Sequence, residues 1–107
     1  MTTEQNRSVL TQLRQELARA LGARLVRVVL YGSQARGEAR EDSDLDVLVV
    51  VRGEFDYGDL MRRTSMSVAA LSLQYDVVIS RVFVTEEEYE RGGSPFFLNV
   101  RREGVLV

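Results

Sequence analysis

Two apolar runs rich in β-branched residues, Leu25–Tyr31 and Leu45–Val51, constrain the fold more than any other feature of the sequence. Each run has the length and composition of a strand, and a polar loop lies between them. From Val47 onward the second run is aliphatic at consecutive positions, so apolar side chains emerge on both of its faces. This strand should therefore lie in the centre of a sheet that is covered on both sides.

Helical patterns surround these strands. Residues 3–21 place apolar side chains at three- and four-residue spacing, and residues 59–74 do the same. Residues 76–79 predict a third strand, and capping signals predict short helices within 85–91 and 94–104. The 107 residues are enough for one domain with a modest core. The sequence thus predicts a single α/β (α+β) domain in which helices flank a small mixed sheet of three strands or slightly more.

Asp44 and Asp46 stand two residues apart at the head of the second predicted strand. Alternate side chains of a strand share a face, so the two carboxylates should lie about 6.6 Å apart along it. Such a pair can jointly hold hard divalent cations such as Mg²⁺, and two cations about 3.5–4 Å apart form a clamp for in-line displacement at phosphorus. The alternating acids of 42–46 also suggest a calcium loop, but an EF-hand needs Gly and Glu where Val47 and Gly53 stand.

Gly32 and Ser33 end the first strand in a way that suits a phosphate group. Gly32 lets a phosphate approach the backbone closely, and Ser33 stands where a helix can begin, with free N–H groups that attract anions. Taken alone, Ser33 is more simply explained as a helix N-cap with no ligand. Together with the two aspartates it predicts a triphosphate cradle beside a metal site. Arg36, closer to the cradle than Arg40, is the arginine expected to reach triphosphate oxygens.

Composition removes most competing chemistries. The chain has no cysteine and no histidine, and all 14 of its cationic residues are arginines. Thiolate nucleophiles, zinc–thiolate sites, imidazole bases, a Walker lysine and Schiff-base chemistry are therefore excluded within the chain. A net charge of −2 gives no basic footprint for nucleic acid, which disfavours a polymerase that acts on long DNA or RNA.

The order Gly32-Ser33, ten residues, then Asp44-Leu45-Asp46 resembles the signature of the DNA polymerase β nucleotidyltransferase superfamily. Residues 32–39, followed by 42–44, resemble the minimal nucleotidyltransferases, which are prokaryotic single-domain proteins often paired with a HEPN-domain toxin. The resemblance implies the nucleotidyltransferase fold, with three strands side by side in chain order. It also implies a third carboxylate on a neighbouring strand. Asp76 is the acid placed to supply it, although an isolated aspartate before an apolar run is more often a turn or cap residue.

The same resemblance implies an activity and a partner. Asp44 and Asp46 would hold two Mg²⁺ ions, and Asp76 would join the ion that activates the acceptor hydroxyl. Gly32 and Ser33 would hold the β- and γ-phosphates of ATP. The chain would then place AMP on a tyrosine of a HEPN toxin and act as its antitoxin. Two alternatives remain open: neutralisation of the toxin by binding without chemistry, and a stand-alone enzyme that modifies a small hydroxylated molecule.

The sequence carries no sign of an export signal or a membrane segment. Residues 1–20 contain Gln, Asn, Glu and Arg in place of an apolar core, and Val47–Val51 is too short to cross a bilayer. We therefore expect a cytoplasmic protein.

Overall fold

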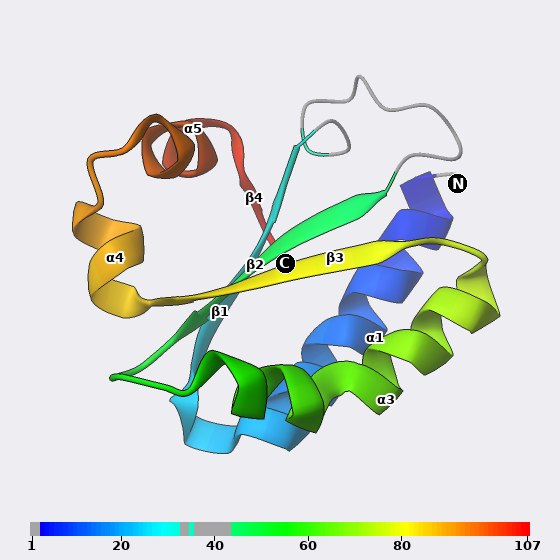
Figure 1. The fold of residues 1–107 in the computed structure, drawn as a ribbon. Coiled ribbons are helices and arrows are strands. Elements are labelled where there is room, and N and C mark those ends of the chain that lie inside the picture. Colours follow the sequence, from blue (N-terminus) through cyan, green and yellow to red (C-terminus); the bar gives the residue numbers. More distant parts are fainter. Residues whose placement is uncertain (1–2, 33–34, 36–43) are drawn as a thin grey trace.

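The computed structural model describes residues 3–32, 35 and 44–107 of the chain. Its strands are β1 (Leu25–Tyr31), β2 (Leu45–Val51), β3 (Ile79–Thr85) and β4 (Val105–Leu106). Its helices are α1 (Thr3–Leu21), the 3₁₀ turn η1 (Gly22–Arg24), α3 (Tyr57–Tyr75), α4 (Glu86–Arg91) and α5 (Pro95–Glu103). Helices lie on both sides of a single sheet (Figure 1). The predicted α/β architecture is confirmed.

The sheet is mixed, and its spatial order is β3-β2-β1-β4. β1 runs antiparallel to both β2 and β4, whereas β2 and β3 are parallel. The first three strands therefore lie side by side in chain order, as the family resemblance implies. β2 is an interior strand on which Asp46 is half-buried and every other residue is buried, so its predicted central position is confirmed.

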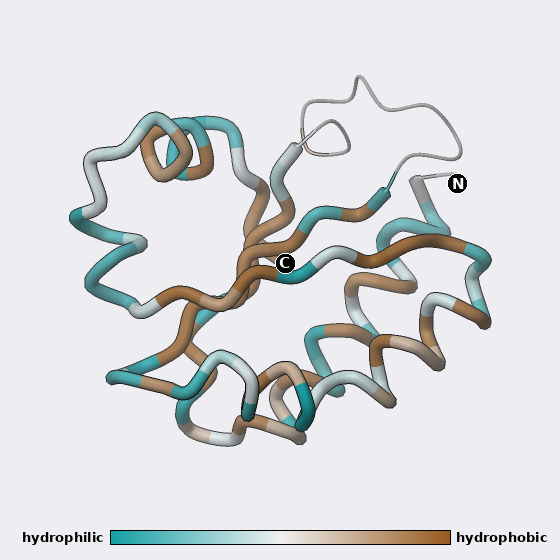
Figure 2. Tube along the Cα trace, viewed as in Figure 1, coloured by the Kyte–Doolittle hydropathy of each residue, from teal (hydrophilic) through white to brown (hydrophobic). Residues whose placement is uncertain are grey.

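One face of the sheet packs against α1 and α3, which lie alongside each other (Figure 1). Figure 2 shows that the strands form the most continuous hydrophobic part of the chain. No helix in the described ranges is both long and apolar enough to span a membrane. The core between this face and the two helices includes Val9, Leu13, Leu17, Val28, Leu30, Leu45, Val47, Val49, Val51, Leu60, Val68 and Leu71.

The opposite face packs against α4 and α5 and has a smaller core. Arg101 joins the two helices, because its guanidinium donates to the carbonyl oxygens of Tyr89 and Gly92, both at 2.7 Å. α4 begins with the predicted capping box of Thr85 and Glu88, and α5 begins after the predicted Ser94 cap. The buried residues of this second core are Val29, Leu48, Val50, Val84 and Val100.

The prediction of a strand over residues 76–79 is wrong for its first three residues. α3 continues to Tyr75, and Asp76 caps it in the left-handed conformation, with φ of 52°. The backbone N–H groups of Asp76 and Val77 both donate to the carbonyl oxygen of Ser72, which closes the helix. β3 therefore begins only at Ile79.

Candidate active site

Asp44 and Asp46 lie at the start of β2, with Asp44 directly before the strand and Asp46 as its second residue. Alternation along the strand places them on the same side as Leu48 and Val50, which belong to the core under α4 and α5. Asp44 is exposed and Asp46 is half-buried. The two acids therefore continue the α5-covered face of the sheet at the point where its apolar core ends.

The end of β1 frames Asp46. Tyr31 pairs with Asp46 across the antiparallel ladder, so the two side chains project from the same face. The next residue, Gly32, has φ of 78°, a left-handed conformation that favours glycine. A Cβ at this position would lie 2.6 Å from Oδ2 of Asp46. Glycine is therefore favoured here both by the backbone and by the carboxylate that occupies the space beside it.

Among the described residues of the site, Asp44 and Asp46 bring two carboxylates close together. Burial, and to a smaller extent the neighbouring Asp44 carboxylate, raise the pKa of Asp46 above its ordinary value. Burial and then the Asp46 carboxylate likewise raise the pKa of the Tyr31 hydroxyl. Carboxylates supply the hard oxygen ligands that Mg²⁺ prefers, and a bound cation would relieve the repulsion between them. The residues present therefore fit a divalent cation.

Asp76 lies at the same end of the sheet as Asp44. Pairing between the parallel strands β2 and β3 starts where the N–H of Leu45 donates to the carbonyl oxygen of Val78 at 2.9 Å. Asp76 precedes that point by two residues and is exposed. In the ranges that the structure describes, no three Asp, Glu, His or Cys side chains are grouped so that they could hold a metal ion. The role of Asp76 as a third ligand stays a prediction.

Two predicted site residues, Ser33 and Arg36, lie outside the described residues. Their contacts with phosphate groups therefore stay predictions. Ala35, which stands between them, is described and packs against the core formed with α1 and α3.

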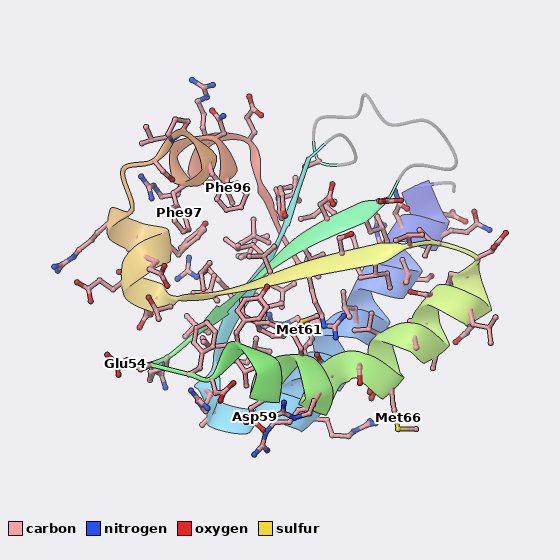
Figure 3. The ribbon with its side chains drawn as sticks, viewed as in Figure 1. Glu54, Asp59, Met61, Met66, Phe96 and Phe97 are labelled. Carbon is pink, nitrogen blue, oxygen red and sulfur yellow. The ribbon has the colours of Figure 1, made fainter. Side chains whose placement is uncertain are left out.

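α5 brings side chains to this region that the sequence did not indicate. Figure 3 shows Phe96 and Phe97 projecting from α5, and the rings of Phe96 and Tyr31 meet edge to face with centroids 5.4 Å apart. The sequence predicted a helix within residues 94–104, but the neighbours of that helix depend on how the chain folds back to the end of β1. A cavity of about 190 Å³, called here the α5 cavity, is lined by Tyr31, Gly32, Phe96, Asn99, Val100 and Glu103.

Comparison with known proteins identifies the family. A sequence model described as a nucleotidyltransferase domain matches residues 10–102. The chain belongs to the nucleotidyltransferase domain family. This nucleotidyltransferase is 37% identical over 86 residues to a Methanocaldococcus jannaschii protein named as a protein adenylyltransferase, and the match covers 78% of this chain and 79% of the relative. It is 47% identical over 49 residues to the protein adenylyltransferase MntA of Thermococcus cleftensis, a match that covers 46% and 48% of the two chains.

Solved structures share the fold of this nucleotidyltransferase. One, described as a minimal nucleotidyltransferase, has a TM-score of 0.58 and 30% identity, and the match covers 94% of each chain. A crystal structure of a toxin–antitoxin with AMP-PNP has a TM-score of 0.58 and 18% identity, and the match covers 88% of this chain and 68% of that one. At this lower identity the likeness shows the fold alone. The nucleotidyltransferase fold and the resemblance to the minimal nucleotidyltransferases are confirmed.

Proposed function

We propose that this nucleotidyltransferase transfers AMP from ATP to a hydroxyl group on a partner protein. The observation that carries the proposal is the close approach of Gly32 to the Asp46 carboxylate, with Asp44 on the same face. This arrangement joins a backbone that a phosphate can approach to a pair of acids that suit divalent cations. The relatives named as protein adenylyltransferases support both the transferred group and the protein acceptor.

In the proposed site, Asp44 and Asp46 would hold two Mg²⁺ ions, and Asp76 would be a further ligand of one of them. Bound Mg²⁺ neutralises the charge of the triphosphate and of the attacking oxygen. Gly32 and Ser33 bind the β- and γ-phosphates through backbone N–H groups, and Arg36 donates to their oxygens.

The proposed reaction is an in-line displacement. The acceptor oxygen forms a bond to the α-phosphorus, and the bond from that phosphorus to the oxygen that bridges the β-phosphate breaks. Pyrophosphate leaves, and the hydroxyl proton passes to the carboxylate of Asp76, which is exposed and so accessible to an arriving partner. The protein contributes mainly positioning and charge neutralisation, as in other phosphoryl transfers.

We further propose that the acceptor is a tyrosine of a HEPN-domain toxin, which this chain silences in the cytoplasm as its antitoxin. The resemblance to the minimal nucleotidyltransferases supports this choice, as does the fold shared with a protein solved in a toxin–antitoxin structure. A domain of 107 residues has little surface with which to enclose an acceptor, so a hydroxyl presented by another protein fits its size. The net charge of −2 makes nucleic acid a poor acceptor.

Intact-mass measurement tests the proposal after the chain is incubated with ATP, Mg²⁺ and a HEPN protein encoded beside it. We expect added AMP units on the HEPN protein with the wild type and none with Asp76→Asn. Asparagine tolerates the left-handed backbone of residue 76, so this change removes the charge and keeps the helix end. Full neutralisation by both proteins without added mass would instead establish inhibition by binding alone. AMP found only on small hydroxylated molecules would establish a stand-alone enzyme.

A further inference from the structure

The α5 cavity shares a residue with the proposed active site. Gly32 lines the cavity, and the same glycine lies against Oδ2 of Asp46. Tyr31 also lines it and pairs with Asp46 across the ladder, so the cavity and the acid lie on the same face of the sheet. A nucleotide whose α-phosphate lies at the two aspartates can therefore place its sugar and base in or beside this cavity.

Larger cavities elsewhere among the described residues do not share this position. One of about 260 Å³ is lined only by α4 residues, Glu86, Glu87, Glu90 and Arg91, and does not include Gly32. Two others lie on the opposite side of the sheet. One of about 420 Å³ is lined by α1, Leu30 and residues 105–107, and one of about 390 Å³ lies between α1 and α3. Both belong to the side of the sheet that α1 covers, whereas Asp46 projects from the other side. The α5 cavity is distinguished not by its volume but by its lining residues Gly32 and Tyr31, which are both next to Asp46.

The walls of the α5 cavity combine an aromatic surface with a polar edge. Phe96 keeps 40% of its surface exposed although its ring packs edge to face against Tyr31. Val100 is buried and supplies an apolar wall, while Asn99 and Glu103 bring an amide and a carboxylate to the same cavity. Aromatic rings that stack on a base, beside side chains that pair with its edge, are the usual means of recognising an unpaired nucleobase.

We propose that the α5 cavity binds the nucleobase of ATP, with Phe96 as its aromatic wall and Asn99 as the residue that reads its edge. The inference rests on the proposed function, because it requires the α-phosphate to lie at Asp44 and Asp46. It adds a base-binding site to that function and names the residues that would select adenine.

The chemistry of the cavity favours adenine over guanine. The amide oxygen of Asn99 accepts a long hydrogen bond of 3.5 Å from Nη2 of Arg102 and has a second lone pair. It can therefore also accept from the N6 amino group of adenine while the amide nitrogen donates to N7. Guanine presents two acceptors, O6 and N7, at the same edge, so one of them would face the amide oxygen.

Calorimetric titration of the full chain with AMP-PNP or GMP-PNP, in the presence of Mg²⁺, tests the inference without requiring any transfer. The wild type should bind AMP-PNP more tightly. Phe96→Ala should weaken AMP-PNP binding about tenfold, a loss typical of an aromatic residue that stacks on a base, and Phe96→Leu should lose less because it keeps apolar volume. Asn99→Ala should weaken AMP-PNP binding and bring the two affinities within about twofold.

Leu98→Ala is the matched control. Leu98 lies on the same helix between the two tested residues, is 53% exposed and does not line the cavity, so this variant should bind both analogues as the wild type does. Thermal unfolding of each variant, compared with this control, separates lost contacts from lost folding.

The outcomes distinguish the two proposals. Wild-type binding of AMP-PNP that Phe96→Ala and Asn99→Ala leave unchanged would overturn the base-binding site and leave the proposed function intact. If those variants instead raised only the KM for the partner protein, the cavity would receive the acceptor side chain and the assignment to the base would be wrong. A folded wild type that binds no nucleotide would overturn the proposed function, and the base-binding site with it.

Discussion

The two faces of β2 differ in what they carry. Toward α1 and α3 the strand presents only apolar side chains, each fully buried: Leu45, Val47, Val49 and Val51. Toward α4 and α5 it presents Leu48 and Val50, which are buried, and then Asp46 and Asp44. One face is therefore core along its whole length, whereas the other changes from core to candidate site at Asp46, the second residue of the strand.

The length of the covering helices explains this difference. α1 and α3 have 19 residues each, whereas α4 has 6 and α5 has 9. At about 1.5 Å per residue, α1 and α3 are each longer than the roughly 23 Å of a seven-residue strand. α4 is shorter than about half of that strand, and α5 is shorter than about two-thirds of it. The short helices leave the start of β2 open. Residues of β2 that face α1 and α3 should therefore matter mainly for stability, and those that face α4 and α5 near the strand start should matter mainly for chemistry. This difference should hold even between residues that are adjacent in the sequence.

Replacement of both acids, Asp44→Asn with Asp46→Asn, should have the largest effect. Transfer should fall on the order of 10³-fold or more, because neutral amides bind the cations poorly and the charge of the triphosphate stays uncompensated. The free energy of unfolding without metal should hold or rise slightly, since the repulsion between the carboxylates is removed. Transfer assays and thermal unfolding in chelator measure both quantities. A folded double variant that transfers at the wild-type rate would refute the metal site.

Leu45→Ala alters the residue between these acids and should have the opposite effect. Removal of a fully buried leucine should lower the free energy of unfolding by about 2–5 kcal/mol, and the folded protein should still transfer AMP. Val49→Ala, farther from the acids on the same face, should also lose stability and keep its activity. Urea unfolding and transfer at low temperature check both variants. Loss of transfer in folded Val49→Ala would show that the two faces are not independent.

Gly32→Ala and Gly53→Ala form a matched pair, because both glycines are left-handed, with φ of 78° and 75°. Each change should cost about 1–2 kcal/mol of stability through backbone strain. A Cβ on Gly53 meets nothing within 4 Å, whereas one on Gly32 meets the movable carboxylate of Asp46 at 2.6 Å. Displacement of that carboxylate should reduce transfer up to about 100-fold in Gly32→Ala alone. Equal transfer by the two variants would contradict the role given to this glycine.

Calorimetry extends the comparison to the rest of the cradle. Gly32→Val should weaken the binding of a non-hydrolysable ATP analogue more than Ser33→Ala does, because it blocks the backbone while the serine change removes one hydroxyl. Unchanged affinity in both variants would place the nucleotide elsewhere on the protein.

The smallest effects concern one polar contact on each side of the sheet. Thr64 accepts from Nε of Arg81 at 2.8 Å, and Thr64→Val should cost about 1–2 kcal/mol by leaving that donor unpaired. Arg101→Gln should cost a similar amount by freeing two carbonyl oxygens of the α4–α5 region. Only Arg101→Gln should also weaken nucleotide binding, because it loosens α5. Weaker nucleotide binding in Thr64→Val would argue against the inference that only the α4–α5 side of the sheet supports the nucleotide site.

Much of the fold was predictable because its signals are local. The bounds of α1, β1 and β2 follow from apolar spacing, and the capping residues mark the starts of α4 and α5. The start of β3 was not predictable, since Asp76 ends α3 in a left-handed conformation with no glycine to mark it. β4 has only two residues, too few for any periodicity, and depends on pairing with β1.

The residues of the candidate site also differ in whether local sequence signals could predict them. Gly32, Asp44 and Asp46 could be predicted because they flank one loop between two strands that pair directly. Phe96 and Asn99 could not, since α5 reaches the end of β1 only after the chain has completed β3 and α4. A sequence pattern shows which side chains are near each other along the chain, and the topology decides which distant ones join them.

The pairing of β1 with the end of the chain has a consequence for protein synthesis. Val29 pairs with Leu106 and Leu30 with Val105, and the N–H of Val107 donates to the carbonyl oxygen of Val28. β1 comprises residues 25–31, so it is synthesised well before residues 105–107, with which it pairs. Domains generally fold as units, so this pairing forms only when the later residues are present. An exposed strand edge is a template for pairing with other chains. Until residues 105–107 have been made, the edge of β1 has no partner within the nascent chain, so pairing between neighbouring nascent chains is the expected route to aggregation.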